Sequence, residues 1–175
     1  MKTYFINSIR FVLLILIQVL ILNQFNVFGY INPIIYPLLI ILLPFNIKSV
    51  QKLILAFILG ISMDIFEDSG GIHAAATLAI AYLRPLFLRN AFGLSYDYQT
   101  LKFYDAPFKE RFIYVSLMVL VHHTVLFSLE IFSVDHLLYF IEKTVYSSIF
   151  SILLIIITLN LIRKNSKLES YSPLY

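Results

Sequence analysis

Residues 50–66 read VQKLILAFILGISMDIF, and this stretch decides the fold. It carries only one lysine near its start and one carboxylate, Asp64, near its end. After the short turn EDSGG (67–71), a second apolar run follows at residues 72–88, IHAAATLAIAYLRPLFL. A transmembrane helix needs about 20 predominantly apolar residues. Two such runs joined by a glycine-containing turn predict a pair of membrane-spanning helices.

The rest of the chain repeats this pattern of apolar runs separated by polar residues. Apolar residues make up 60% of the chain and charged residues only 13%, whereas soluble domains carry about 25% charged residues. The sequence therefore predicts an all-α integral membrane protein, a six-transmembrane-helix bundle forming a single membrane domain over residues 1–175. The expected spans are residues 9–25, 30–47, 50–66, 72–88, 112–132 and 137–162, with a cytoplasmic segment at 89–111 and a cytoplasmic tail at 163–175.

The second of these runs, residues 30–47, contains three prolines. Pro33 lies near the expected helix start, where proline is tolerated. Pro37 is expected to kink the span and Pro44 to disturb its end, because proline removes a backbone donor.

Basic residues predict the orientation, because they accumulate on the cytoplasmic side of membrane proteins. With the N-terminus placed in the cytoplasm, every lysine and arginine except Lys143 falls in a cytoplasmic segment or near the cytoplasmic end of a helix. Arg84 is one of those near a helix end, and we expect its side chain to extend toward the headgroups. Both termini are therefore expected in the cytoplasm. The opposite side carries an outer polar cluster of carboxylates, Glu67, Asp68, Glu130, Asp135 and Glu142.

Small residues and a carboxylate share one face of the third run. Ala56, Gly60 and Asp64 are spaced four apart, so they lie on the same side of a helix. Small side chains let another helix approach closely. Asp64 at the end of this seam is interpreted either as a polar contact for a partner helix or an outward-facing site, or as a carboxylate that is wetted or caps the following turn. We expect Asp64 and His73 to face each other across the turn.

Two adjacent histidines, His122 and His123, fall in the middle of the fifth run. Neighbouring residues on a helix point about 100° apart, so these rings cannot bind one metal ion together. We interpret them as neutral, hydrogen-bonded interior side chains. His123 and Glu130 are two turns apart on one face and are candidates for a proton relay, although no second deep acid completes the path.

Catalytic signatures are missing from the sequence. There is no cysteine, no phosphate-binding loop, no H-E-x-x-H and no G-x-S-x-G motif. The basic residues follow the expected membrane topology and form no patch for nucleic acid. The sequence therefore predicts a protein that is not an enzyme, with no catalytic residue, no cofactor and no metal site, in contact with the lipid bilayer and not with nucleic acid.

The third and fourth runs together resemble the family of the rod shape-determining protein MreD. The resemblance is carried by GISMDIF at residues 60–66, GGIHA at residues 70–74 and AYLR at residues 81–84. It singles out Gly60, Asp64, Gly70, Gly71 and His73 as residues of a structural or partner-binding hairpin. The general layout of apolar runs and a short basic tail is also similar.

This resemblance implies a multi-pass protein of the bacterial inner membrane that acts as a scaffold of the cell-elongation complex, which builds peptidoglycan in rod-shaped cells. Its implied partner is a bitopic MreC-type protein, together with MreB, RodA and a class B penicillin-binding protein. The family's fold resembles the substrate-binding components of energy-coupling-factor transporters, so a vitamin-binding transporter subunit is the alternative. An ion channel is disfavoured, because no full span carries a polar stripe.

Overall fold

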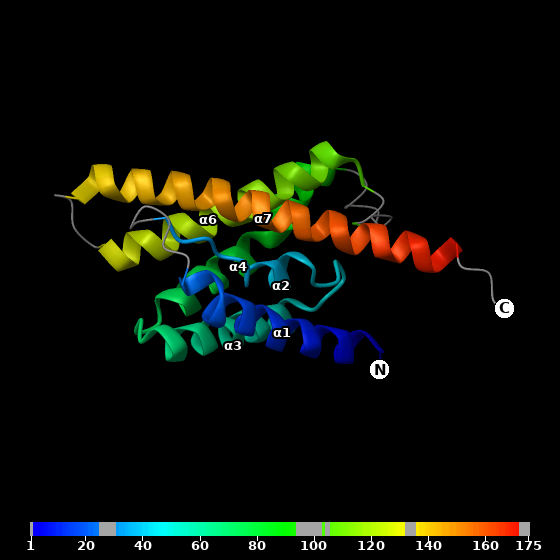
Figure 1. Ribbon diagram of the computed structural model, residues 1–175, viewed down its shortest axis with the longest axis horizontal. Helices are drawn as coiled ribbons and strands as arrows, with labels where there is room; N and C mark the ends of the chain where they lie inside the picture. Colours follow the sequence, from blue (N-terminus) through cyan, green and yellow to red (C-terminus); the bar gives the residue numbers. More distant parts are fainter. Residues whose placement is uncertain (1, 25–30, 94–102, 104–105, 132–135, 172–175) are drawn as a thin grey trace.

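The computed structural model describes residues 2–24, 31–93, 103, 106–131 and 136–171. The regular elements of these residues are all helices, which confirms the all-α prediction. Figure 1 shows the long helices running side by side along the long axis of the molecule. The elements are α1 (Lys2–Leu20), η1 (Leu22–Gln24), α2 (Leu38–Ile41), α3 (Ser49–Glu67), α4 (Ile72–Phe92), α6 (Phe108–Ile131) and α7 (Leu137–Tyr171).

Helix α4 lies between α3 and α6, and α6 in turn packs against α7. Along α3 the buried positions recur at helical spacing, with Lys52, Ala56, Leu59, Gly60 and Met63 turned inward. This single inward stripe explains why α3 packs on one side only. The other sides of the helix are left to face its surroundings.

Among the described residues, three helices are long and apolar enough to cross a membrane: Ser49–Glu67, Phe108–Ile131 and Leu137–Ile162. A shorter apolar helix covers residues Ser8–Gln24. Large aliphatic side chains are exposed along the outer faces of these helices, and Ile65 and Leu138 are exposed by 76% and 71%. Extended apolar surfaces of this kind are unfavourable in water and typical of contact with lipid. The structure therefore supports the membrane assignment for these helices, and it does not confirm a bundle of six transmembrane helices.

The prediction of a helix over residues 30–47 is wrong. Residues 31–35 are irregular, and the only α-helix in this stretch is the single turn Leu38–Ile41. Pro37 occupies the N-cap position of this turn. Neither Pro33 nor Pro37 has a backbone N–H that could continue a helix from the residues before it. Pro44 follows the end of the turn.

Helix boundaries elsewhere also differ from the sequence prediction, and α1 covers Lys2–Leu20 where a helix was expected over residues 9–25. Helix α4 extends to Phe92 and α6 begins at Phe108, so both ends of the predicted cytoplasmic segment 89–111 are helical. Helix α7 continues to Tyr171, past the expected start of the tail at residue 163. The middle of segment 89–111 falls largely outside the described residues.

Side chains from two distant helices satisfy the backbone of the irregular stretch 31–35. The N–H of Asn32 donates to Ser147 Oγ at 3.1 Å, and the N–H of Ile34 donates to Ser151 Oγ at 2.8 Å. Gln18 completes the pattern, since its Oε1 accepts from the N–H of Ile35 and its Nε2 donates to the Pro33 carbonyl. Irregular backbone at membrane depth is stable only where protein groups replace water in this way.

Arg84 satisfies backbone carbonyls at the other end of the segment between α1 and α3. Its guanidinium donates to the carbonyls of Leu43 and Pro44, and its Nε donates to Tyr114 Oη at 3.0 Å. The side chain also lies over the Phe45 ring, 5.6 Å from the centroid. Arg84 is only 2% exposed, so the expectation that it extends toward the headgroups is wrong. The free carbonyls that follow α2 attract the guanidinium inward.

Arg84→Lys is expected to lower the unfolding free energy by about 2 kcal/mol, because one ammonium cannot reach three acceptors and hydrogen bonds to charged groups contribute about 1.5–3 kcal/mol each. The measurement is the thermal unfolding midpoint of the purified chain in detergent. Arg89→Lys, at an exposed position of the same helix, is the control and should change stability by less than about 0.5 kcal/mol. Equal midpoints for the two variants would contradict the assigned role of Arg84.

Candidate functional site

The α3–α4 hairpin is closed by the carboxylate of Asp64. Its Oδ1 accepts from the backbone N–H of His73 at 2.9 Å and from Ser69 Oγ at 2.6 Å, and its Oδ2 accepts from the N–H of Ala74 at 2.9 Å. The first N–H groups of a helix have no partner within the helix, and a carboxylate there also interacts favourably with the helix dipole. Of the interpretations left open by the sequence, the cap of the following helix describes this geometry.

The turn between the two helices needs backbone conformations that favour glycine. Gly70 and Gly71 have φ values of 67° and 102°, and Asp68 also has a positive φ of 49°. Gly71 is the N-cap residue of α4. A side chain at Gly71 would meet no neighbouring atom, so conformational freedom and not space explains the glycine.

Gly60, in contrast, allows α3 to pack closely against α4. A Cβ placed at Gly60 would overlap the backbone of Ala74, 2.6 Å from its nitrogen, and the Thr77 hydroxyl. Ala56 and Gly60 are both buried. The small-residue seam of α3 is thus occupied by α4 of the same chain.

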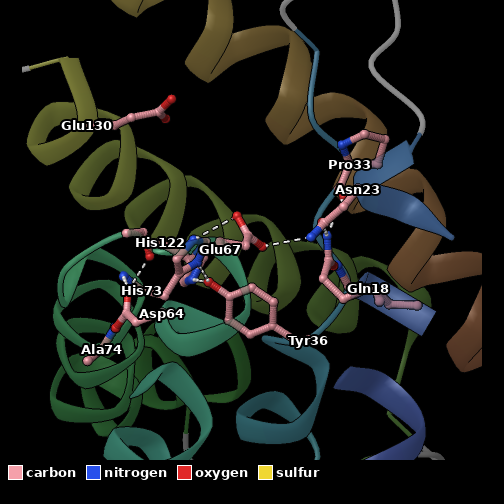
Figure 2. A network of polar contacts seen from close by, with 12 residues as sticks. Gln18, Asn23, Pro33, Tyr36, Asp64, Glu67, His73, Ala74, His122 and Glu130 are labelled. Atoms are coloured by element: carbon pink, nitrogen blue, oxygen red, sulfur yellow. Dashed lines mark hydrogen bonds and ion pairs between the residues drawn. The ribbon is translucent and has the colours of Figure 1, made fainter. Parts of the chain in front are cut away.

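A chain of four hydrogen-bonded side chains leads from the hairpin into the bundle, and we call it the polar chain (Figure 2). His73 Nε2 lies 3.1 Å from Glu67 Oε2, and His73 Nδ1 lies 2.7 Å from Tyr36 Oη. Tyr36 Oη also lies 2.8 Å from His122 Nε2. The imidazole of His73 therefore turns away from Asp64, which contacts only its backbone. The polar chain consists of Glu67, His73, Tyr36 and His122.

A second branch of polar groups starts from the same carboxylate. Asn23 Nδ2 donates to Glu67 Oε1 at 3.0 Å, and Gln18 Nε2 donates to Asn23 Oδ1 at 2.8 Å. Since Gln18 also holds the irregular backbone, this branch ties α1 and η1 to the end of α3. Figure 2 shows Glu67 between the two branches.

These groups border a polar cavity of about 540 Å³. The elements that enclose it are the ends of α1 and α3, the irregular stretch, the hairpin turn and α6. Of the outer polar cluster predicted from the sequence, three members line this cavity and Glu142, which is exposed on α7, does not. Asp135 lies outside the described residues. The lining side chains that bear polar groups are Gln18, Asn23, Asn32, Glu67, Asp68, Ser69, His73 and Glu130.

Glu130 and His123 have separate partners. Glu130 Oε1 accepts from Lys143 Nζ at 2.6 Å, and the same ammonium lies 4.8 Å from the centroid of the Phe127 ring. His123 Nδ1 lies 3.0 Å from the Val119 carbonyl and its Nε2 lies 3.0 Å from Ser151 Oγ. The two side chains considered for a relay are thus engaged elsewhere, and the continuous polar path passes through His122.

Sequence reasoning missed several members of the site. Tyr36, Gln18 and Asn23 were not singled out, although Gln18 is an amide within an otherwise apolar run and Tyr36 stands next to a proline. The pairing of Lys143 with Glu130 was also missed. The signal for it was that Lys143 is the one basic residue expected on the outer side.

The part of the chain that the structure describes contains no group of three histidine or carboxylate side chains placed to hold a metal ion. The fold and the site define an all-helical chain with helices able to cross a membrane and a polar cavity at one end of the helix bundle. No family model, no curated protein and no solved structure matches this chain.

Proposed function

We propose that this chain is a non-enzymatic membrane scaffold of the bacterial cell-elongation complex, similar to MreD, which binds a bitopic MreC-type partner. The observation that carries the proposal is the hairpin geometry. The residues on which the resemblance rests, Gly60, Asp64, Gly71 and His73, all take part in one closely packed hairpin. A fixed hairpin of this kind presents its turn as a defined contact surface.

The contact surface proposed is the acidic rim formed by Glu67 and Asp68. Asp68 is exposed, the Glu67 side chain is 29% exposed, and both residues line the cavity. With both termini in the cytoplasm, the rim lies at the outer face of the inner membrane, where the extramembrane part of a bitopic partner begins. A basic or amide-rich segment of the partner next to its transmembrane helix fits this rim by charge. MreB, RodA and the class B penicillin-binding protein join the assembly directly or through this partner.

The test is retention of the MreC-type partner by the tagged chain in mild detergent. We expect a complex without any added nucleotide or cofactor, and depletion of the protein should make rod-shaped cells round up. Asp68→Asn should weaken binding of the partner by up to about fivefold, because exposed ion pairs contribute about 0.2–1 kcal/mol. Asparagine tolerates the positive φ at this position.

The matched control removes the same charge at the other end of the bundle. Glu110, in the first turn of α6, is distant from the hairpin turn along the helix axis. Glu110→Gln should leave partner retention unchanged. Failure to retain the partner with the unaltered chain, or equal loss with both variants, contradicts the proposal.

The cavity favours a second candidate, the substrate-binding subunit of an energy-coupling-factor-type vitamin transporter. Its volume of about 540 Å³ lies within the range of about 300–1,000 Å³ typical of small-molecule sites. The molecules that co-purify with the chain distinguish the two candidate functions. A vitamin carried through purification, together with association with an ATPase module, would favour the transporter subunit over the scaffold.

A further inference from the structure

With Glu67 ionised and the His122 ring neutral, the polar chain has two ways to arrange its hydrogens. Tyr36 Oη has one hydrogen, yet it lies within hydrogen-bond distance of a ring nitrogen on each side. It must therefore donate to one imidazole and accept from the other. Tyr36 and His122 are fully buried and His73 is nearly so, which leaves no room for water to replace either bond.

The first arrangement contains two neutral imidazoles. The Glu67 carboxylate only accepts, so His73 carries its hydrogen on Nε2 and its Nδ1 accepts from the hydroxyl of Tyr36. The oxygen of Tyr36 then accepts from Nε2–H of His122. In this arrangement Nδ1 of His122 carries no hydrogen, and its lone pair has no partner among the described residues.

The second arrangement contains one more proton, and every bond of the polar chain beyond Glu67 is reversed. His73 is doubly protonated, so its Nδ1–H donates to Tyr36 and its Nε2–H still faces Glu67. Tyr36 then donates to Nε2 of His122, and the hydrogen of that ring lies on Nδ1. The added positive charge sits 3.1 Å from a carboxylate oxygen.

We propose that the polar chain is a proton wire, in which protonation of His73 beside the cavity and the tautomer of His122 inside the bundle change together. The step is balanced by one proton supplied by water. That proton reaches the buried Nδ1 of His122 when the bundle opens locally. The Nε2 proton of the same ring then passes to the Tyr36 oxygen, and the hydroxyl proton of Tyr36 passes to Nδ1 of His73. Transfer of a proton from Nε2 of His73 to Glu67 would then release that proton to the cavity.

The two ends of the wire differ in their access to solvent. At the outer end, the Glu67 side chain lines the cavity and is 29% exposed, so its carboxylate can exchange protons with solvent there. At the inner end, Nδ1 of His122 is buried and has no hydrogen-bond partner among the described residues. An unpaired buried nitrogen of this kind is costly in a purely structural side chain.

Among the described elements packed on the wire, the charged and titratable groups come from α3, the hairpin turn, α6 and α7. Helix α3 contributes Asp64 and Glu67, the hairpin turn Asp68, α6 His123 and Glu130, and α7 Lys143, which is paired with Glu130. This proposal goes beyond partner binding and does not depend on it.

Nitrogen NMR of the full chain in detergent, with ¹⁵N-labelled histidine, tests the wire. The four histidines are assigned by single substitutions to glutamine. As the pH falls, we expect His73 to gain its second proton and Nδ1 of His122 to change from a bare nitrogen to an N–H, with one common midpoint. Tyr36→Phe, which keeps the ring, should separate the two midpoints or abolish the change at His122.

Tyr114→Phe is the matched control, because Tyr114 is an equally buried tyrosine on α6 that hydrogen-bonds to Arg84 instead. It should leave the common midpoint intact. The proposal is overturned if His73 becomes doubly protonated while Nδ1 of His122 stays bare, or if Tyr36→Phe leaves one common midpoint. The titration of the unaltered chain decides the question even where Tyr36→Phe proves too unstable to measure.

Discussion

Gly60→Ala is expected to destabilise the protein by about 3 kcal/mol, and Gly60→Leu to prevent its accumulation. The added Cβ would overlap the backbone of Ala74, which cannot move without displacing the start of α4. Overpacking in a closely packed contact costs about 1–3 kcal/mol and more where the backbone must shift. The thermal unfolding midpoint in detergent, and the amount of folded protein in the membrane fraction, measure the effect.

Ser62→Ala is the matched control, because it places the same alanine side chain two positions along the same helix. The Ser62 hydroxyl bonds only to the Ile58 carbonyl of its own helix, at an exposed site. This variant should stay within about 0.5 kcal/mol of the unaltered chain. A harmless Gly60→Ala would show that α3 and α4 do not approach as closely as described.

Asp64→Asn is expected to cost about 3 kcal/mol, although it changes few atoms. Both carboxylate oxygens of Asp64 accept from backbone N–H groups, those of His73 and Ala74. Asparagine must turn its NH₂ group toward one of these donors, so one hydrogen bond becomes a repulsive contact. Hydrogen bonds to charged groups contribute about 1.5–3 kcal/mol, and an unpaired buried donor adds to the loss.

A graded series separates the cap from the charge. Ser69→Ala removes one part-buried hydrogen bond to the same carboxylate and should cost about 1.5 kcal/mol, the lower end of the range for hydrogen bonds to charged groups. Asp68→Asn removes a neighbouring exposed charge and should cost almost nothing. An Asp64→Asn variant as stable as Asp68→Asn would contradict the capping role. Unfolding midpoints measured under one set of conditions give the order.

The sequence predicts the helices of this fold where apolar runs are long and uninterrupted. Helices α3 and α7 lie on the runs expected for them, since the apolar content of a run is a local property. The hairpin was also accessible to sequence reasoning, because glycines and a carboxylate at the end of an apolar run are local signals. The choice among interpretations of Asp64 required knowing which N–H groups reach it.

The irregular stretch 31–35 could not be predicted, because its stability comes from residues far away in the chain. Apolar composition alone suggested a span, and the prolines were expected only to bend it. The acceptors that make an irregular backbone stable there are Ser147, Ser151 and Gln18. Nothing local in the sequence revealed which backbone groups these side chains would bond.

The polar chain was hidden for a related reason. Its four members come from four separate segments, so no motif joins them. The sequence suggested a relay through His123, because His123 and Glu130 share a helix face. The neighbouring ring of His122 points instead toward Tyr36, and only the position of the irregular stretch brings that tyrosine within reach.

The bonds between the irregular stretch and α7 have a consequence for how the protein is made. A ribosome completes α7 more than a hundred residues after residues 32–34, since the two hydrogen bonds join positions 115 and 117 apart. Until α7 enters the membrane, the N–H groups of Asn32 and Ile34 lack these acceptors and must be met by lipid headgroups, water or an insertion factor. The stretch after α1 therefore reaches its final hydrogen bonding only after α7 is made. A nascent chain that stops before Ser147 is expected to be cleaved by proteases between α1 and α3.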